Sequence, residues 1–163
     1  MKDRKYAGII AIVFMAVITA FTIWGTDFLA SLEKTTKEPM EIGETKGVKE
    51  AFKLVNSSGD VRGYEVVVKA DGFYESMTLG VSFDEDGQTV TGFNVIKQNE
   101  TPGLGDKITT PEFKAQVVKK IAPLYVGDME PVGTKLEAIT GATFSTKGVA
   151  NGINIAYNFI NGK

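Results

Sequence analysis

The chain has 163 residues, of which 43% are hydrophobic and 23% charged, a composition that suits one globular domain of ordinary size. It contains no cysteine and no histidine, which excludes thiolate nucleophiles, imidazole bases and the common Cys/His zinc and iron–sulfur sites. Its net charge of −2 and pI near 5.3 argue against nucleic acid as a partner, which normally requires a clustered basic face.

Residues 6–26 (YAGIIAIVFMAVITAFTIWGT) form an apolar run without a charged side chain. A helix of this length spans about 30 Å, the thickness of a bilayer core, which predicts a single transmembrane helix in contact with membrane lipid. Lys2, Arg4 and Lys5 precede the run and Asp27 follows it. The positive-inside rule therefore predicts that residues 1–5 are cytoplasmic and that the chain after Trp24, with the globular domain, lies outside the cell (inner) membrane.

Two alternatives to this anchor stay open. A cleaved signal peptide fits less well, because the run exceeds the usual apolar region and Ala30 has Phe28, a large residue, at the −3 position. A buried helix of a soluble protein also fits less well, because no second segment of similar hydrophobicity exists to pack against it. The sequence therefore favours a membrane anchor.

Residues 27–47 combine charges, threonines, a proline and two glycines without sustained periodicity, which is typical of a short stalk or linker. The globular domain is predicted over residues 48–163. Apolar residues at its start recur with helical spacing at Val48, Phe52 and Val55. This spacing predicts an opening amphipathic helix that ends at the turn-forming cluster 56–59.

Three segments then predict the strands of an antiparallel meander: 63–70, 76–83 and 89–97. The second segment alternates strictly, with its apolar side chains on one face (Met77, Leu79, Val81 and Phe83). Turn residues follow the first two strands, at 71–72 and 84–87. The predicted fold class is therefore α+β, an N-terminal transmembrane helix followed by a small domain with an antiparallel sheet and flanking helices.

Residues 99–107 (NETPGLGDK) predict an irregular loop, because a proline and two glycines prevent regular structure. Leu104 is the single apolar side chain of this loop. A helix is predicted next, with Thr109 or Thr110 as its cap and Pro111 in its first turn. Its core-facing stripe is predicted at Phe113, Val117 and Ile121.

A short strand is predicted at 136–139, and a closing helix is predicted to start just after Thr143, with Ser145 or Thr146 as N-cap. The stretch between them, 139–148 (ITGATFSTKG), brings hydroxyls, small residues and one lysine to a helix N-terminus. The free N–H groups and the dipole of such a terminus attract anions, and Gly141 and Ala142 allow a phosphate to approach the backbone. Lys147 adds a positive charge.

The same residues have a second interpretation, in which the hydroxyls of Thr140, Ser145 or Thr146 only cap the helix and no ligand binds. Residue spacing alone favours this second interpretation. The order of residues differs from a P-loop, because Lys147 precedes a glycine and no serine or threonine follows it. Nucleotide hydrolysis is therefore not predicted, and neither catalytic side chains nor metal ligands are assigned.

Residues 140–143 (TGAT) resemble the S/T-G-A-T motif of covalent FMN-binding domains, and residues 99–105 (NETPGLG) resemble their E-T-P-G-L-G loop. The two motifs occur in the same order as in that family, and the preceding strands are also similar, so the resemblance covers about 48–163. Together with the N-terminal anchor, the chain most resembles the G subunits of Rnf-type electron-transport complexes. It next resembles the C subunits of the sodium-pumping NADH:quinone oxidoreductase.

The resemblance implies a phosphoester between FMN and the hydroxyl of Thr143, made by a separate flavin transferase that uses FAD and magnesium. It implies further FMN-binding residues around the motif (Thr140, Gly141, Ala142, Ser145, Thr146 and Lys147). It also implies a second group in the loop, with Leu104 against the flavin ring (Glu100, Thr101, Gly103, Leu104 and Gly105). Glu137 stands where the family commonly has an aspartate. The other interpretation of the loop is a rigid turn that joins the sheet to a helix.

The implied function is electron transfer by the flavin, because the ring itself accepts one or two electrons. The implied partners are other membrane and redox subunits of an Rnf-type complex that links ferredoxin and NAD to Na⁺ or H⁺ movement. Two other classes stay open. One is a flavin carrier of another electron-transfer route, and the other is an anchored binding module without a cofactor.

Overall fold

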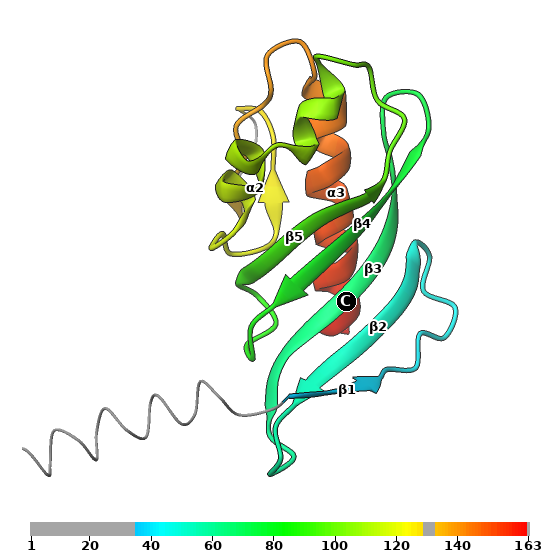
Figure 1. The fold of residues 1–163 in the computed structure, drawn as a ribbon, viewed down its shortest axis with the longest axis vertical. Coiled ribbons are helices and arrows are strands. Elements are labelled where there is room, and N and C mark those ends of the chain that lie inside the picture. The colour runs from blue at the N-terminus through cyan, green and yellow to red at the C-terminus, as the bar shows by residue number, and fades with distance from the viewer. Residues whose placement is uncertain (1–34, 129–132, 163) are drawn as a thin grey trace, which may run out of the picture. The chain divides into compact units, whose positions relative to one another are not determined.

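An antiparallel sheet of five strands organises the described part of the chain, residues 35–128 and 133–162 of a computed structural model (Figure 1). The strands lie side by side in chain order: β1 (Thr36–Pro39), β2 (Val48–Val55), β3 (Val61–Asp71), β4 (Ser76–Phe83) and β5 (Val90–Lys97). Every neighbouring pair is antiparallel. The last three strands confirm the predicted meander.

The predicted transmembrane helix 6–26 and the N-terminal residues 1–5 lie outside the described residues. Within 35–128 and 133–162, no helix has the length and apolar character that crossing a bilayer requires. The described residues belong to one unit that starts at Thr35. The sheet thus begins before Val48, and the prediction of an irregular linker is wrong for 36–39, where β1 pairs with β2.

The predicted opening helix is wrong, because Val48–Val55 forms strand β2. Ala51 and Val55 of this strand are buried, while Phe52, between them, is half-buried and lines a hollow on the open face of the sheet. Strand β2 carries apolar residues on both faces of the sheet, and this is why Val48, Phe52 and Val55 recur with the spacing of a helix. Backbone pairing with β1 on one side and β3 on the other decides the conformation, since strand preference depends strongly on neighbouring strands.

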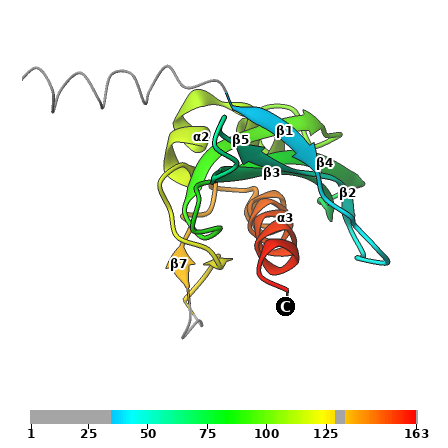
Figure 2. The same cartoon turned by 90° about the horizontal axis from the view of Figure 1, so that it is seen from below.

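Helix α3 (Thr143–Ile160) covers one face of the sheet, as Figure 2 shows. The alternating apolar side chains of β4 are buried toward it, each at most 1% exposed (Met77, Leu79, Val81 and Phe83). Gly148 permits close contact between α3 and β3, because a Cβ there would stand 2.3 Å from the carbonyl oxygen of Asp71. The predicted start of the closing helix is confirmed, but its predicted caps are wrong. Ala142 is the N-cap residue, and it makes no side-chain capping bond.

The described part of the segment between β5 and α3 contains four short elements. They are η1 (Gly105–Thr109), α2 (Pro111–Val117), β6 (Leu124–Tyr125) and β7 (Thr134–Lys135). Thr110 caps α2 by accepting a hydrogen bond from the N–H of Phe113, as predicted. Ile121 is not part of the α2 stripe. It follows the helix, is 55% exposed and bridges to Thr89.

The strand predicted at 136–139 is also wrong, because the extended pairing lies two residues earlier. Strand β7 pairs in parallel with β6 over Thr134 and Lys135. Leu136 is nevertheless fully buried, so its side chain belongs to the core although its backbone is outside the strand. The chain then leads through an irregular segment to the start of α3.

Candidate functional site

The two motifs singled out in the sequence meet at the N-terminal end of α3. Leu104 of the 99–105 loop lies against the turn that precedes the helix, because a Cβ at Gly141 would stand 3.2 Å from its Cδ2 atom. Gly141 has φ = +79°, a left-handed conformation that strains any residue with a side chain. The turn therefore needs glycine both for its backbone and for its contact with the loop.

A cavity of about 290 Å³ opens where these two segments meet. One wall is the loop, with Thr101, Leu104 and Gly105. A second wall is the turn and the first residues of α3 (Gly141, Ala142, Thr143, Phe144 and Ser145). The third wall is the tip of the hairpin between β3 and β4, with Phe73 and Tyr74.

Thr143 is exposed at the first position of α3 and lines this cavity. The N–H groups at the start of a helix lack partners within the helix, and among the described residues the cap at Ala142 supplies no side-chain acceptor for them. The first turn also contains no acidic side chain. A hydroxyl group and a set of backbone donors thus face the same opening, which suits an anion such as a phosphate.

The hydroxyls of Ser145 and Thr146 form hydrogen bonds within the protein. Thr146 is fully buried, and its Oγ1 donates to the carbonyl of Ala142 (3.0 Å) while accepting from the N–H of Ile139 (3.1 Å). Ser145, which is 2% exposed, donates a short hydrogen bond to the carboxylate of Glu100. These hydroxyls hold the turn and the loop to the helix instead of capping it.

Glu100 lies behind the cavity wall and joins all three walls. It is only 6% exposed, and its Oε1 accepts from the N–H of Phe73 at 2.9 Å while its Oε2 accepts from Ser145. Two glycines leave room for this carboxylate. A Cβ at Gly72 would stand 2.1 Å from Oε1, and a Cβ at Gly105 would stand 2.9 Å from Oε2.

The remaining predicted residues lie away from the cavity. Lys147 is exposed and lines a different hollow, beside residues 123–126, so its charge does not face Thr143. Gly103 is exposed in the loop and Thr140 is exposed in the turn, and neither contributes to the cavity lining. Gly103 has φ = +76°, which gives it a conformational role in the loop.

Three aromatic residues that line the cavity were missed by the sequence analysis. Phe73, Tyr74 and Phe144 are 54%, 67% and 68% exposed. Two adjacent aromatic residues in a hairpin tip (DGFYE) are a signal that could have found them, because turns are normally built from small and polar residues. Phe144 directly follows the motif threonine.

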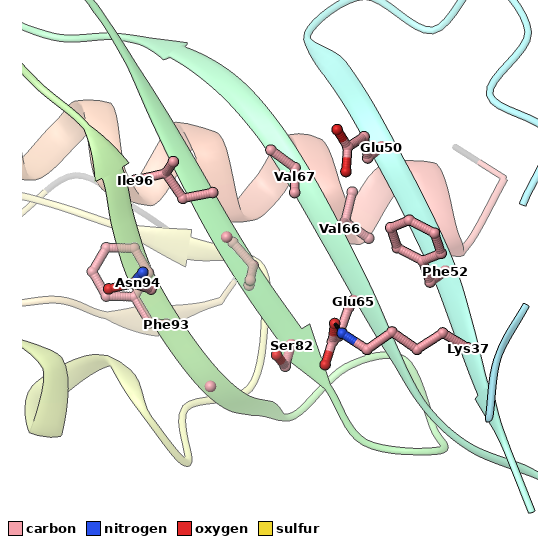
Figure 3. A pocket seen from close by; sticks show the side chains of 13 residues that line it. Lys37, Glu50, Phe52, Glu65, Val66, Val67, Ser82, Phe93, Asn94 and Ile96 are labelled. Carbon is pink, nitrogen blue, oxygen red and sulfur yellow. Dashed lines mark hydrogen bonds and ion pairs between the residues drawn. The ribbon is translucent and has the colours of Figure 1, made fainter. Parts of the chain in front are cut away.

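A larger hollow of about 460 Å³ lies on the open face of the sheet. Figure 3 views it with α3 behind the sheet, and its floor includes Val67 between Phe52 and Ile96. An ion pair between Lys37 and Glu65 closes one side. None of the residues predicted from the motifs lines it.

The fold and the cavity thus define a small α+β module in which a hydroxyl, a helix N-terminus and exposed aromatic rings surround one cavity. Residues 72–158, more than half of the chain, match the family model of the FMN-binding domain. The chain therefore belongs to the FMN-binding domain family. This confirms the predicted family and the predicted cofactor, FMN, whereas the roles of individual residues stay predictions.

Relatives with assigned names fall into the two predicted groups. The chain is 38% identical over 109 residues to the G subunit of the ion-translocating oxidoreductase complex of Methanosarcina acetivorans, covering 67% of this chain and 57% of that one. It is 32% identical to the G subunit of the Na⁺-translocating ferredoxin:NAD⁺ oxidoreductase complex of Acetobacterium woodii, with coverages of 61% and 50%. It is 33% identical to the C subunit of the Na⁺-translocating NADH-quinone reductase of Vibrio anguillarum, with coverages of 59% and 42%.

The chain spans about half the length of these relatives. A solved structure shares its fold: the C subunit of the Na⁺-translocating NADH-quinone reductase of Parabacteroides distasonis superposes with a TM-score of 0.54. The two sequences are 23% identical, and the match covers 70% of this chain and 64% of the other. The predicted antiparallel sheet with flanking helices is thereby confirmed.

Proposed function

We propose that this chain is a membrane-anchored electron carrier with FMN esterified to Thr143, and that it belongs to an Rnf-type complex. Such a complex couples electron transfer between ferredoxin and NAD to the translocation of Na⁺ or H⁺. One observation carries the proposal. The TGAT turn and the ETPGLG loop meet around a single cavity, and the Thr143 hydroxyl is exposed there at the first turn of α3.

The residues present fit a phosphoester at this position. Gly141 and Ala142 keep the approach to the backbone free of large side chains, and the first-turn N–H groups offer donors to phosphate oxygens. No acidic residue of the first turn repels a phosphate. The buried Glu100 carboxylate accepts from Phe73 and Ser145 and therefore does not face the phosphate as an unpaired anion.

Attachment exchanges the phosphoanhydride bond of FAD for a phosphoester bond to the protein. The Oγ atom of Thr143 attacks the phosphorus of FAD that bears the riboflavin group, the bond from this phosphorus to AMP breaks, and the hydroxyl proton is lost. The chain contains no histidine or cysteine that could act as the base. As the family resemblance implies, a separate flavin transferase with magnesium supplies the chemistry, and the exposure of Thr143 makes the hydroxyl accessible to it.

When bound, FMN supplies the electron transfer, because the ring accepts and releases one or two electrons. The chain retains and orients it. A covalent bond prevents loss of the cofactor from a domain outside the membrane, where a dissociable flavin would be diluted. The cavity of about 290 Å³ is open to solvent, so a neighbouring redox protein has access to the flavin.

The names of the relatives support a complex of this kind, and the sequence identities and covered lengths favour the Rnf type. Identity is 38% to a G subunit and 33% to a C subunit, and the match covers more of the former protein. The role of the C subunit in a sodium-pumping NADH:quinone oxidoreductase is the second candidate, supported by that 33% identity. Purification of the intact complex distinguishes them through the identities of the neighbouring subunits.

The anchored topology rests on the apolar segment 6–26 and on the basic residues before it. Protease added to intact spheroplasts is expected to digest the FMN-binding domain, because this domain is proposed to lie outside the membrane. Full protection of the domain until the membrane is opened would contradict the topology. It would leave the flavin proposal untouched.

Intact mass of the full chain, coexpressed with its flavin transferase, tests the covalent bond. The wild-type chain is expected to gain the mass of one FMN less water, and Thr143→Ala is expected to gain none. Thr109→Ala is the matched control, because Thr109 is an exposed threonine outside the cavity whose hydroxyl bonds to Asp106. An FMN-sized adduct retained by Thr143→Ala would refute the assignment, and a colourless wild-type chain would favour the cofactor-free binding module.

A further inference from the structure

We propose that the tip of the β3–β4 hairpin is part of the flavin site and that its aromatic rings, together with Phe144, contact the isoalloxazine ring. This inference rests on the proposed function, because the ring in question belongs to the FMN on Thr143. The two sequence motifs account for two walls of the flavin site, and the inference adds the hairpin tip as a third wall. It also makes Glu100 a positioning residue instead of a flavin ligand.

The first observation is where the apolar surface is exposed. Six large hydrophobic side chains are exposed in the described part of the chain, and four of them line this cavity (Phe73, Tyr74, Leu104 and Phe144). Single exposed apolar residues are ordinary, but a contiguous group marks a binding surface. The other two, Ile96 and Ile121, lie outside the cavity.

The second observation is that the three aromatic rings form one cluster across two elements. The ring of Phe73 lies 4.7 Å from that of Tyr74 and 5.9 Å from that of Phe144, measured between centroids. The interplanar angles are 80° and 50°. Phe144 follows the threonine that would carry the phosphate, so the cluster begins next to the point of attachment.

The third observation is that the hairpin is held at a set distance from α3. Glu100 accepts from the backbone N–H of Phe73 with one oxygen and from Ser145 of α3 with the other. Gly72 donates its N–H to the carbonyl of Glu75 at 2.9 Å, which closes the tip. Because a Cβ at Gly72 would overlap the Glu100 carboxylate, only glycine permits this approach.

The chemistry of the lining selects the kind of ligand. Among the described residues that line the cavity, none carries a charge; the wall consists of aromatic, aliphatic, hydroxyl and glycine groups. A flat, uncharged heteroaromatic ring suits such a surface, because aromatic rings gain from offset or edge contacts beyond simple burial. The isoalloxazine ring matches this description, whereas a charged segment of a partner protein would find no counter-charge in the lining.

Time-resolved flavin fluorescence of the full flavinylated chain tests the inference. A tyrosine in contact with the excited ring donates an electron to it and shortens its lifetime, so the short-lived fraction reports the contact. In Tyr74→Leu the ratio of short-lived to long-lived flavin is expected to fall about twofold to tenfold, as loss of one aromatic contact implies. Ile96→Ala, which alters an apolar residue of similar exposure on the open sheet face, should leave the ratio unchanged.

Two further variants separate contact from structure. Tyr74→Phe keeps the ring and removes the oxidisable phenol, so it should lengthen the lifetime while leaving the thermal unfolding curve in place. Glu100→Gln keeps an acceptor oxygen and should shift the lifetime ratio less than Glu100→Ala does. If both Tyr74 variants retain the FMN mass and the wild-type lifetimes, the inference is wrong. Unchanged lifetimes combined with weaker association with the complex would assign the rings to partner docking and would likewise overturn it.

Intact mass distinguishes a failure here from a failure of the proposed function. If the wild-type chain gains no FMN mass, the ester is refuted, and the contact is then measured by titrating the same protein with free FMN. Quenching of the added FMN by the wild-type chain, and less quenching by Tyr74→Leu, would support the aromatic wall without the ester. Equal quenching by the two proteins would overturn it.

Discussion

The two ends of α3 meet two different hairpins of the same sheet. At the N-terminal end, Ser145 reaches Glu100, which holds the β3–β4 tip with its exposed aromatic rings. At the C-terminal end, Asn161 donates to the carbonyl of Gly87 at 3.1 Å, in the β4–β5 turn. One end thus exposes apolar surface around a cavity, and the other meets a turn built from acidic side chains.

This difference separates the proposed binding end of the helix from its supporting end. Exposed aromatic side chains are unfavourable in water unless something covers them, so their position indicates a ligand. The β4–β5 turn instead satisfies its backbone with its own carboxylates. Asp86 Oδ1 accepts from the N–H groups of Gln88 (2.6 Å) and Thr89 (3.0 Å). No ligand is needed to explain that end.

The largest effect is expected where α3 is pressed against β3, close to the binding end. In Gly148→Ala the new Cβ would meet the carbonyl oxygen of Asp71 at 2.3 Å, and backbone cannot move aside cheaply. We expect the free energy of unfolding to fall by about 3 kcal/mol, although helix propensity alone would favour alanine by about 1 kcal/mol. Thermal unfolding of the purified chain measures this.

Gly152→Ala is the matched control for that substitution. Its Cβ would meet the Cδ1 atom of Leu79 at 2.6 Å, which is the end of a flexible side chain and not backbone. A smaller loss of stability is therefore expected. If Gly148→Ala were as stable as the wild type, the close contact between the helix and the base of the hairpin would be wrong.

The next effect concerns the carboxylate that joins the three walls. Glu100→Ala leaves the N–H of Phe73 and the hydroxyl of Ser145 without their acceptor, which is expected to lower the free energy of unfolding by about 2 kcal/mol. Glu75→Ala, on the same hairpin but exposed, should change it little. Equal stability of both variants in thermal unfolding would show that Glu100 does not hold the hairpin.

A smaller effect is expected at the cavity wall itself. Leu104→Asp should leave the ester intact, because Thr143 is untouched, but should place a negative charge beside the flavin. We expect the two-electron potential to fall by about 30 mV, which corresponds to about 1.4 kcal/mol. Leu104→Asn separates the effect of charge from the loss of the apolar contact. An unchanged potential and an unchanged visible spectrum in Leu104→Asp would remove this residue from the ring's surroundings.

The parts of the fold that the sequence predicted are those whose packing is one-sided. Strand β4 alternates strictly because only one of its faces is covered by α3, so its period is visible in the chain. Strand β2 carries apolar residues on both faces, and its spacing therefore resembles that of a helix. Strand β1 has no apolar pattern, since all four residues are exposed and backbone pairing with β2 alone identifies it.

The candidate site also has a part that the sequence predicted and a part that it did not. The residues of the two motifs are contiguous in sequence, so the loop and the turn were predicted directly. Phe73 joins them only through the folded sheet, which brings the β3–β4 tip beside the start of α3. The role of Ser145 was misjudged for a related reason. Its partner, Glu100, is distant in the sequence, and helix capping was the local explanation available.

The smallest effect belongs to the supporting end of α3. Burial, and then the hydrogen bond and the negative charge of Asp86, raise the pKa of Asp84 above 3.8. The hydrogen bond from Asp84, followed by the N–H groups of Gln88 and Thr89, lowers the pKa of Asp86. One Asp84 oxygen is buried without a hydrogen-bond partner among the described residues. The ionised form of Asp84 is therefore the unfavourable one in the folded chain.

A group whose pKa is raised by folding stabilises the fold below its unfolded value, and this contribution is lost as the pH rises through the folded value. Asp84→Asn removes the ionised carboxyl, so we expect this variant to be more stable than the wild type at pH 7, by less than about 1 kcal/mol. The advantage should shrink toward pH 3, where Asp84 of the wild type is protonated. Glu85→Gln is the control, since its ion pair with Arg62 is long, at 3.9 Å, and exposed. A variant Asp84→Asn that melts below the wild type at pH 7 would show that Asp84 supports the turn as a carboxylate, and the two hairpins would then differ less than their side chains indicate.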